Sequence, residues 1–432
     1  MADLLIHNAI LVDSRGTRQG WIEVSGDKIS AAGDGAPAAT DAKEVVDVRG
    51  AYLIPGLTDT HVHFRDPGLT HKADIESESR AALAGGVTTV FDMPNTVPAV
   101  TTVEILEEKR RLIASKNPPV RIIPLMGVAS GAMKELPALV KLADVPAVKL
   151  FLGTTTGAMT APDDRELEDV FRFLADHDLP VIVHAEDNAL INANMAAAVA
   201  RFGAPEKVPV SLHSAIRCRE ACLRSAARAV DLAHRFGTHL HLAHVSTADE
   251  VRELLEPGPT AGKLVTAETT ALYLDPATVR RADSCLLKIN PAIKTLDDAK
   301  ALREAVLNGK IDTIGTDHAP HLREEKMLPG MKAMSGAPSI QFAVQVLLNT
   351  LPLETVVEKM TAGPATVFRI DIPETFVPGT RADFSIVREV EPYRISDADV
   401  VSKCAWTPFD GLEVSHRIES VWVAGIRRIP VA

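Results

Sequence analysis

The sequence is poor in aromatic residues and in cysteine. Phe, Trp and Tyr make up 4% of the 432 residues, so Val, Ile, Leu and Ala must fill most of the core. The four cysteines form no CxxC pair, which argues against a small fold held together by disulfides. We predict reduced structural thiols in a cytoplasmic protein, at Cys218, Cys222, Cys285 and Cys404.

The sequence also lacks an excess of basic residues and any long apolar run. It has 46 Lys and Arg against 57 Asp and Glu, a balance that argues against nucleic acid or an anionic membrane as partner. No apolar run is long enough to span a bilayer, and the start MADLLIHNAILVD is too polar for a signal peptide. A hydrophobic content of 46% instead indicates a soluble globular protein with a large core.

Short strand-like segments occupy both ends of the chain. Strand-like segments near the start are LLIHNAILVD and WIEVSGDKISAAG, and those near the end are RADFSIVR and RIESVWVAGIRRIPV. Turn residues separate the segments at the start from one another. The termini of a domain often lie close together. We therefore expect residues 1–54 and 373–432 to form one small β-sandwich domain.

The middle of the chain alternates between apolar strands and helical stretches. TTVFDMP precedes VEILEEKRRLIASK, AVKLFLG precedes DRELEDVFRFLADH, and HLHLAHVS precedes ADEVRELLE. Continuous apolar strands between helices predict a parallel sheet covered on both faces. About eight such units fit into residues 55–372, which is the length of a (β/α)8 barrel. A doubly wound open sheet is the alternative, and no G-x-G-x-x-G follows the first strand to support it.

A few polar residue types recur where the predicted strands end. They are His61, His63, Asn95, Lys149, His184, His244, Asp317, His318 and His321. In barrels of this kind the chemistry takes place at the carboxyl ends of the strands. An HxH pair alone is more often an ordinary surface or core feature. Its recurrence with His, Asp and Lys at four other strand ends predicts a metal site.

The number of candidate ligands indicates two metal ions. His61 and His63 are two residues apart, so on a strand they share one face and can bind one ion with Asp317. His184 and His244 can bind a second ion. Two neighbouring ions need a bridging anion between them.

Spacing alone leaves several positions undecided. Lys149 could supply the bridge as a carbamate formed with CO2, but the simpler interpretation is a lysine that reaches solvent or a salt bridge. His239 and His241 share one face of their strand, and the position at the strand end favours His244 over both as the ligand. His318 and His321, beside the candidate ligand Asp317, are equally undecided.

Several motifs together closely resemble the dihydroorotases of the amidohydrolase superfamily. They are PGLTDTHVHFRDPG, AALAGGVTTVFDMPNT, VKLFLGTTTG, VHAED, LAHVS, INPAIKT and GTDHAPH. The similarity covers nearly the whole chain, as far as WTPFDGLEV. HxH alone would indicate only the superfamily, whereas HVHFR, MPNT and DHAPH together are specific. The resemblance implies a (β/α)8 barrel with a β-sandwich from the two ends, and two zinc ions per subunit bridged by carboxylated Lys149.

The resemblance also implies a role for each candidate residue. The metal ligands are His61, His63, Lys149, His184, His244 and Asp317, and Asp317 is also the catalytic residue. The substrate-binding positions are Arg65, Asn95, Asn290, His321, Ser335 and Gly336, of which the last two act through their backbone. Thr155 matches a threonine of a mobile loop over the active site. The resemblance therefore assigns His244 to metal, His321 to substrate, and neither His239 nor His241 to metal.

Two stretches depart from the family pattern. Many relatives carry tandem histidines after the seventh strand, where this chain reads AETTALYL. HKADIESES replaces a version that contains Thr and Gly. Neither departure removes a proposed ligand, but together they leave the subfamily open.

The implied reaction is the reversible hydrolysis of dihydroorotate to N-carbamoyl-aspartate in pyrimidine biosynthesis. Arg65, predicted one step beyond His63 on the same face of the strand, offers the substrate carboxylate a planar fork of donors. The alternatives are another cyclic amidase, such as allantoinase or a dihydropyrimidinase/hydantoinase, whose substrate lacks that carboxylate, and a non-catalytic scaffold. We expect a homo-oligomer, most simply a dimer. The family allows a complex with aspartate transcarbamoylase, of which the sequence shows no sign.

Overall fold

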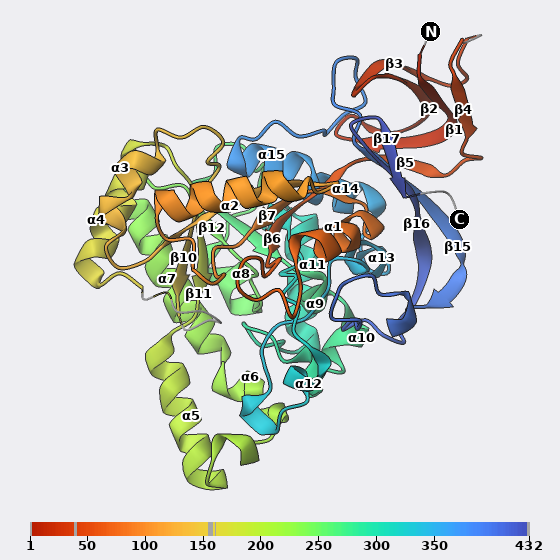
Figure 1. The fold of residues 1–432 in the computed structure, drawn as a ribbon. Coiled ribbons are helices and arrows are strands. Elements are labelled where there is room, and N and C mark those ends of the chain that lie inside the picture. The colour runs from red at the N-terminus through yellow and green to blue at the C-terminus, as the bar shows by residue number, and fades with distance from the viewer. Residues whose placement is uncertain (1, 39–40, 154–158, 160, 430–432) are drawn as a thin grey trace.

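The structure, a computed structural model, describes residues 2–38, 41–153, 159 and 161–429. A barrel ringed by helices lies beside a smaller unit made of strands (Figure 1). The loop residue Thr155, predicted to lie over the active site, falls outside the described residues. Within the described ranges, no helix has the length and apolar character needed to cross a membrane.

Strands from the two ends of the chain share one eight-stranded sheet. The strands are β1 Leu4–Asp13, β2 Gly16–Ser25, β3 Lys28–Asp34, β4 Glu44–Asp47, β5 Tyr52–Pro55, β15 Phe384–Arg394, β16 Glu413–Val423 and β17 Ile426–Ile429. Their order is β17-β16-β15-β5-β1-β2-β3, and β4 pairs with β1. The antiparallel pairing of β5 with β15 joins the two ends. In the hydrophobic core beside this sheet, the ring of Phe384 stacks on that of Trp422, with 4.9 Å between the ring centroids.

In the described part of residues 55–372, nine short parallel strands form the barrel. They are β6 Leu57–Val62, β7 Val87–Asp92, β8 Arg121–Pro124, β9 Met126–Val128, β10 Val148–Leu152, β11 Val181–Ala185, β12 Leu240–Leu242, β13 Val265–Thr269 and β14 Thr313–Ile314. Because only Leu125 separates β8 from β9, these two count as one interrupted strand, which leaves eight. A parallel bridge between Val62 and His318 brings the segment after β14 against β6. The predicted (β/α)8 fold is confirmed.

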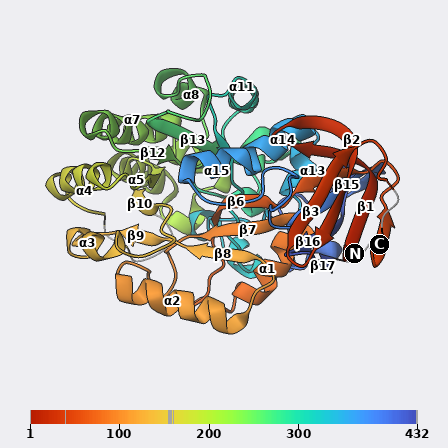
Figure 2. The same cartoon turned by 90° about the horizontal axis from the view of Figure 1, so that it is seen from above.

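Helices surround these strands, as the view from above shows (Figure 2). The helices are α1 Ile75–Ala84, α2 Val103–Lys116, α3 Leu136–Leu139, α4 Asp164–Asp176, α5 Asn188–Phe202, α6 His213–Ile216, α7 Arg219–Phe236, α8 Ala248–Leu254, α9 Ala271–Leu274, α10 Pro276–Val279, α11 Leu296–Leu307, α12 Arg323–Lys326, α13 Ala343–Leu347, α14 Leu353–Met360 and α15 Ala362–Phe368. In α4 the buried residues Leu167, Val170 and Phe171 recur at helical spacing. The side chain of Asp163 caps this helix by accepting from the Glu166 N–H.

The four cysteines all lie in the described part of the chain, and none forms a disulfide. Cys222 and Cys404 are buried, whereas Cys218 and Cys285 are partly exposed. Burial raises the pKa of the Cys404 thiol to about 12, so this thiol is unreactive at neutral pH. The prediction of reduced thiols agrees with this arrangement.

Candidate active site

A pocket opens at the carboxyl ends of the barrel strands. Its walls are formed by His61, His63, Arg65, Asn95, Phe151, His184, His244, Asn290, Asp317, Ala319, Ser335 and Gly336. Of these residues, the sequence did not indicate Phe151 and Ala319. Lys149 and His321 do not line the pocket but lie directly behind residues that do.

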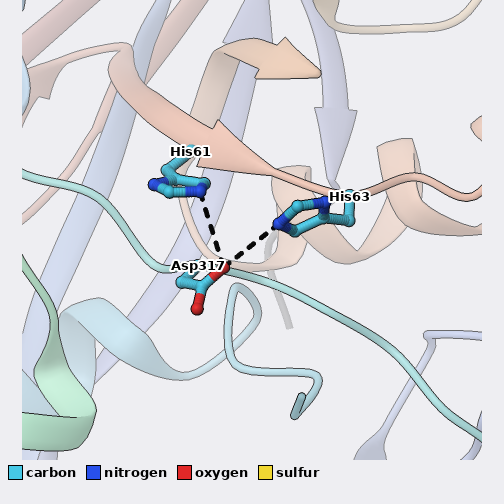
Figure 3. A group of neighbouring side chains, drawn as sticks. All are labelled: His61, His63 and Asp317. Atoms are coloured by element: carbon cyan, nitrogen blue, oxygen red, sulfur yellow. Dashed lines mark hydrogen bonds and ion pairs between the residues drawn. The ribbon is translucent and has the colours of Figure 1, made fainter. Parts of the chain in front are cut away.

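Two histidines and one aspartate form a compact cluster in this pocket (Figure 3). One oxygen of Asp317, Oδ1, lies 3.2 Å from Nε2 of His63 and 3.6 Å from Nε2 of His61. The potential ligand atoms of the three residues all lie within 4.8 Å of one another. His61 lies on β6 and His63 just past its end at Val62, so the two rings still face the same side, 5.5 Å apart. Nitrogen and oxygen donors in this arrangement can hold a divalent metal ion.

A second pair of imidazoles adjoins the first cluster. Nδ1 of His184, on β11, lies 2.8 Å from Nε2 of His244. His244 follows β12 with a left-handed φ of +39°, which turns its ring toward His61 at 5.2 Å between centroids. Lys149, on β10 and fully buried, places Nζ 3.2 Å from Nε2 of His61. The predicted ligand positions therefore gather in one place.

Burial keeps these imidazoles neutral, which is the form that binds metal ions. It lowers the pKa of His61 to about 4, and it lowers the pKa values of His63, His184 and His244 as well. Burial also lowers the pKa of the Lys149 ammonium, to about 8.

Two buried carboxylates orient the imidazoles from behind, and neither is among the residues predicted from the sequence. Glu268 places Oε1 2.9 Å from Nδ1 of His61 and accepts from the Thr60 hydroxyl at 2.5 Å. Glu186 places Oε2 3.1 Å from Nε2 of His184 and pairs with Arg217. Such contacts fix the ring orientation and tautomer of a ligand. The available signals were the position of Glu186 two residues after His184 and that of Glu268 in AETT at the end of β13.

Arg65 departs from its predicted backbone position. The sequence placed it on the strand in phase with His63, but β6 ends at Val62 and Arg65 adopts a left-handed φ of +66°. Its buried guanidinium donates from Nε to Pro320 O at 3.1 Å and lies, through NH2, 3.3 Å from Nε2 of His321. NH1 is buried without a hydrogen-bond partner among the described residues. Arg65 therefore keeps an unused donor in the wall of the pocket.

Another part of the pocket wall combines Asn290 with the loop around Ser335 and Gly336. Oδ1 of Asn290 is buried and has no partner within the described part of the chain. Nζ of Lys288 donates to Oγ of Ser335 at 3.1 Å, and the Gly336 N–H donates to Lys288 O at 3.0 Å. Gly336 has φ +137°, and a Cβ there would meet Ala319 O at 2.7 Å. Only glycine therefore lets the backbone pass this close to the pocket.

The remaining predicted residues take other partners. Oδ1 of Asn95 lies 2.5 Å from Nδ1 of His63, so Asn95 orients a ligand as well as lining the pocket. His318 is bonded on both nitrogens, with Nε2 2.7 Å from Glu78 and Nδ1 accepting from the Ile340 N–H, so neither nitrogen faces a metal.

The two histidines left undecided on the sixth strand also lie outside the cluster. His241 lies 2.9 Å from the Thr266 hydroxyl, and His239 pairs with Asp178 at 3.2 Å.

A barrel with His, Asp and Lys gathered at its strand ends defines a hydrolase of the metal-dependent kind. The chain belongs to the amidohydrolase family, whose sequence model matches residues 52–427. Curated relatives of the chain include dihydroorotases. It is 34% identical to the one from Halobacterium salinarum over 419 residues, which covers 94% of this chain and 92% of that protein. It is 30% identical to the one from Pediococcus pentosaceus over 438 residues, which covers 98% of each chain.

Solved structures with the same fold include hydantoinases. The L-hydantoinase (dihydropyrimidinase) from Arthrobacter aurescens is 27% identical, with a TM-score of 0.90 over 100% of this chain and 97% of that one. The dihydropyrimidinase from Brevibacillus agri is 24% identical, with a TM-score of 0.86 over 99% of this chain and 95% of that one. At this identity the second likeness concerns the fold alone.

Proposed function

We propose that the protein is a dihydroorotase, a metal-dependent cyclic amide hydrolase that converts dihydroorotate and water reversibly into N-carbamoyl-aspartate. The observation that carries the substrate assignment is the unpartnered NH1 of Arg65, a buried cation beside the metal-ligand cluster. A buried N–H donor without an acceptor is costly, and a substrate carboxylate would satisfy it. Identity of up to 34% with dihydroorotases over most of the chain supports the same substrate.

The donor set fits two zinc ions. His61, His63 and Asp317 would hold one, His184 and His244 would hold the other, and all five are buried or lie at the pocket wall. When bound, the ions supply a water whose pKa lies near neutrality and a positive charge that polarises the amide carbonyl. Both kinds of ligand, imidazole nitrogen and carboxylate oxygen, are ones that zinc prefers.

Lys149 would supply the bridging anion as a carbamate. Burial lowers the pKa of its ammonium to about 8, which leaves a share of neutral amine at physiological pH. The nitrogen of the neutral amine forms a bond to the carbon of CO2 and loses one proton to solvent, so a neutral group becomes an anion with two oxygens. Such a group has two oxygens to offer to two ions, which the ammonium lacks.

Asp317 would move the proton of the reaction. Its carboxylate accepts a proton from the attacking water as the new C–O bond forms, and gives it to the ring nitrogen as the C–N bond breaks. Burial raises the pKa of this carboxyl, which makes the carboxylate a stronger base than an exposed one. In the biosynthetic direction the same group transfers the proton in reverse.

Other pocket residues would bind and orient the substrate. Arg65 and His321 lie next to each other and would take the carboxylate. Asn95 would add a contact, and Asn290 has a free acceptor, Oδ1, suited to a ring N–H. The backbone of Ser335 and Gly336 would complete the substrate site.

We expect Arg65→Ala to weaken substrate recognition by about 2–5 kcal/mol, because a buried charge partner of the carboxylate is lost. KM for dihydroorotate should rise while the zinc content stays that of the wild type. Steady-state kinetics and metal analysis of the same sample measure both. Arg252→Ala, on the exposed side of α8, is the control. Loss of zinc with unchanged KM would contradict this role.

Glu268→Gln should lower zinc affinity by about 10–100-fold, because the charged partner that orients the His61 ring is removed. Competition with a chelating dye measures the dissociation constant directly, without reference to turnover. Glu253→Gln, on exposed α8, serves as a matched control. An unchanged dissociation constant in Glu268→Gln would show that Glu268 does not orient the ligand.

A hydantoinase is the second candidate, because the Arthrobacter aurescens enzyme shares the fold at 27% identity. Its substrate class lacks the carboxylate that Arg65 would bind. A scaffold without activity is a weaker alternative, since all six proposed ligand positions are kept. We expect a cytoplasmic homo-oligomer, most simply a dimer.

A further inference from the structure

The segment HKADIESES, which departs from the family pattern, places a buried lysine against the proposed substrate site. Lys72 is 6% exposed, and its Nζ lies 3.1 Å from Nδ1 of His321 and 2.8 Å from Oε1 of Glu325. His321 is fully buried. Its opposite nitrogen, Nε2, faces NH2 of Arg65 at 3.3 Å. The imidazole thus lies between two cations.

A neutral imidazole between two such donors can accept from only one of them. Ammonium and guanidinium groups donate and never accept, so the nitrogen that accepts carries no proton and the other carries one. Burial lowers the pKa of His321 to about 3, which keeps the ring neutral. Either Lys72 donates to Nδ1 and the proton lies on Nε2, or Arg65 donates to Nε2 and the proton lies on Nδ1.

The surroundings favour the first arrangement. Nδ1 lies closer to Lys72, at 3.1 Å, than to Glu325, the carboxylate that would accept from an Nδ1 proton, at 3.4 Å. That Glu325 oxygen already accepts from the Leu322 N–H at 2.9 Å. Arg65 lines the pocket and can direct its donors to a ligand, whereas Lys72 does not line it.

The edge of the ring that carries Nε2 adjoins two residues that line the pocket, Gly336 and Arg65. A Cβ placed on the pocket residue Gly336 would meet Cδ2 of His321, the atom bonded to Nε2, at 2.9 Å. Arg65, on the other side of this edge, has the unpartnered NH1. A proton on Nε2 would therefore add a donor beside the NH1 group, which also lacks an acceptor, and an anionic oxygen would satisfy both.

We propose that Lys72 is a positioning residue that fixes His321 as the Nε2–H tautomer, so that His321 and Arg65 together donate to an anionic oxygen of the substrate. Glu325 holds the ammonium in place through its ion pair. The identity of that oxygen as the dihydroorotate carboxylate rests on the proposed function, whereas the tautomer does not.

Nitrogen-15 NMR of the zinc-loaded protein labelled at histidine tests the tautomer without substrate. The signals of His321 are assigned by their loss in His321→Asn. We expect the chemical shift of a protonated nitrogen at Nε2 and that of an unprotonated one at Nδ1. The reverse pattern in the wild-type protein would overturn the proposal, and this result needs no Lys72 variant to fold.

Lys72→Met then tests the consequence for binding. It removes the ammonium at similar volume and frees Nδ1 to donate to Glu325, so the tautomer should switch. KM for dihydroorotate should rise about 10–100-fold, as for one lost charge-assisted contact, with kcat changed less and zinc content unchanged. Lys359→Met removes another buried lysine that is paired with a glutamate. It should match the wild type in KM, kcat and zinc content.

The outcomes separate this inference from the proposed function. An unchanged tautomer in Lys72→Met would overturn the role of Lys72, whatever happens to KM, and so would an unchanged KM. If the wild-type protein does not hydrolyse dihydroorotate, the proposed function fails, while the NMR result still decides the tautomer.

Discussion

Replacing Asp317 with alanine should abolish the hydrolysis of dihydroorotate, with a loss in kcat of at least about 10³-fold. The same carboxylate would hold a metal ion beside His61 and His63 and move the proton from water to the leaving nitrogen. Among the residues that the structure describes, no other carboxylate lines the pocket and could take over the transfer. Stopped assays at high concentrations of the Asp317→Ala variant measure how much turnover of dihydroorotate remains.

Asp317→Asn is the companion variant, since it keeps the shape and removes the proton acceptor. Asp249→Ala, on α8 away from the pocket, controls for the loss of an aspartate. Metal analysis of each sample distinguishes a lost ligand from a lost base. Normal activity in Asp317→Ala would show that the proposed mechanism is wrong.

Replacing Lys149 with alanine should remove metal and activity together. Without the carbamate, two cations would lie close together with no bridging anion between them, so at least one site should empty. The cavity left by the side chain is fully buried and flanked by His61, and a short carboxylic acid can enter it. Acetate or propionate should therefore restore part of the zinc content and part of the turnover.

The control for this variant is Lys263→Ala. That lysine pairs with Asp312 at the amino end of the strands, away from the pocket, and its loss should leave zinc content unchanged. Full occupancy by two ions in Lys149→Ala, without any added acid, would contradict a bridging role for Lys149.

Much of the fold could be predicted because the pattern that specifies it is local. The stretch VEILEEKRRLIASK coincides with α2, and DRELEDVFRFLADH with α4 except for its final histidine. Apolar runs between such helices leave few options besides a parallel barrel. Since strands of a barrel end at one face, polar residues at those ends had to converge, and six of the twelve wall residues could be predicted in this way. The wall residues Arg65, Asn290, Ser335 and Gly336 were instead implied by the family resemblance.

The partners behind the pocket could not be predicted, because they depend on how the barrel closes. Glu268 reaches the Thr60 hydroxyl and the His61 ring across more than 200 residues of sequence, 208 in the case of Thr60. Glu78 and Lys72 lie far from His318 and His321 along the chain and meet them only in the folded structure. No periodicity reports such pairs.

The backbone of Arg65 was missed for a different reason. The prediction assumed that the extended backbone of the strand continues through Arg65, whereas Arg65 has a left-handed φ of +66°. Non-glycine residues adopt this conformation rarely, so a pattern read from residue types assigns them to the extended region. The side chain still reaches the pocket, by a route that strand parity does not describe.

The proposal that the protein is a zinc-dependent dihydroorotase is tested most directly by a steady-state assay of dihydroorotate hydrolysis, with metal analysis of the same purified sample. Hydantoin, dihydrouracil and allantoin serve as competing substrates. We predict turnover of dihydroorotate well above that of the other three, with two zinc ions per chain. Preferential turnover of a cyclic amide without a carboxylate would contradict the assignment as a dihydroorotase, and so would no turnover at full metal occupancy.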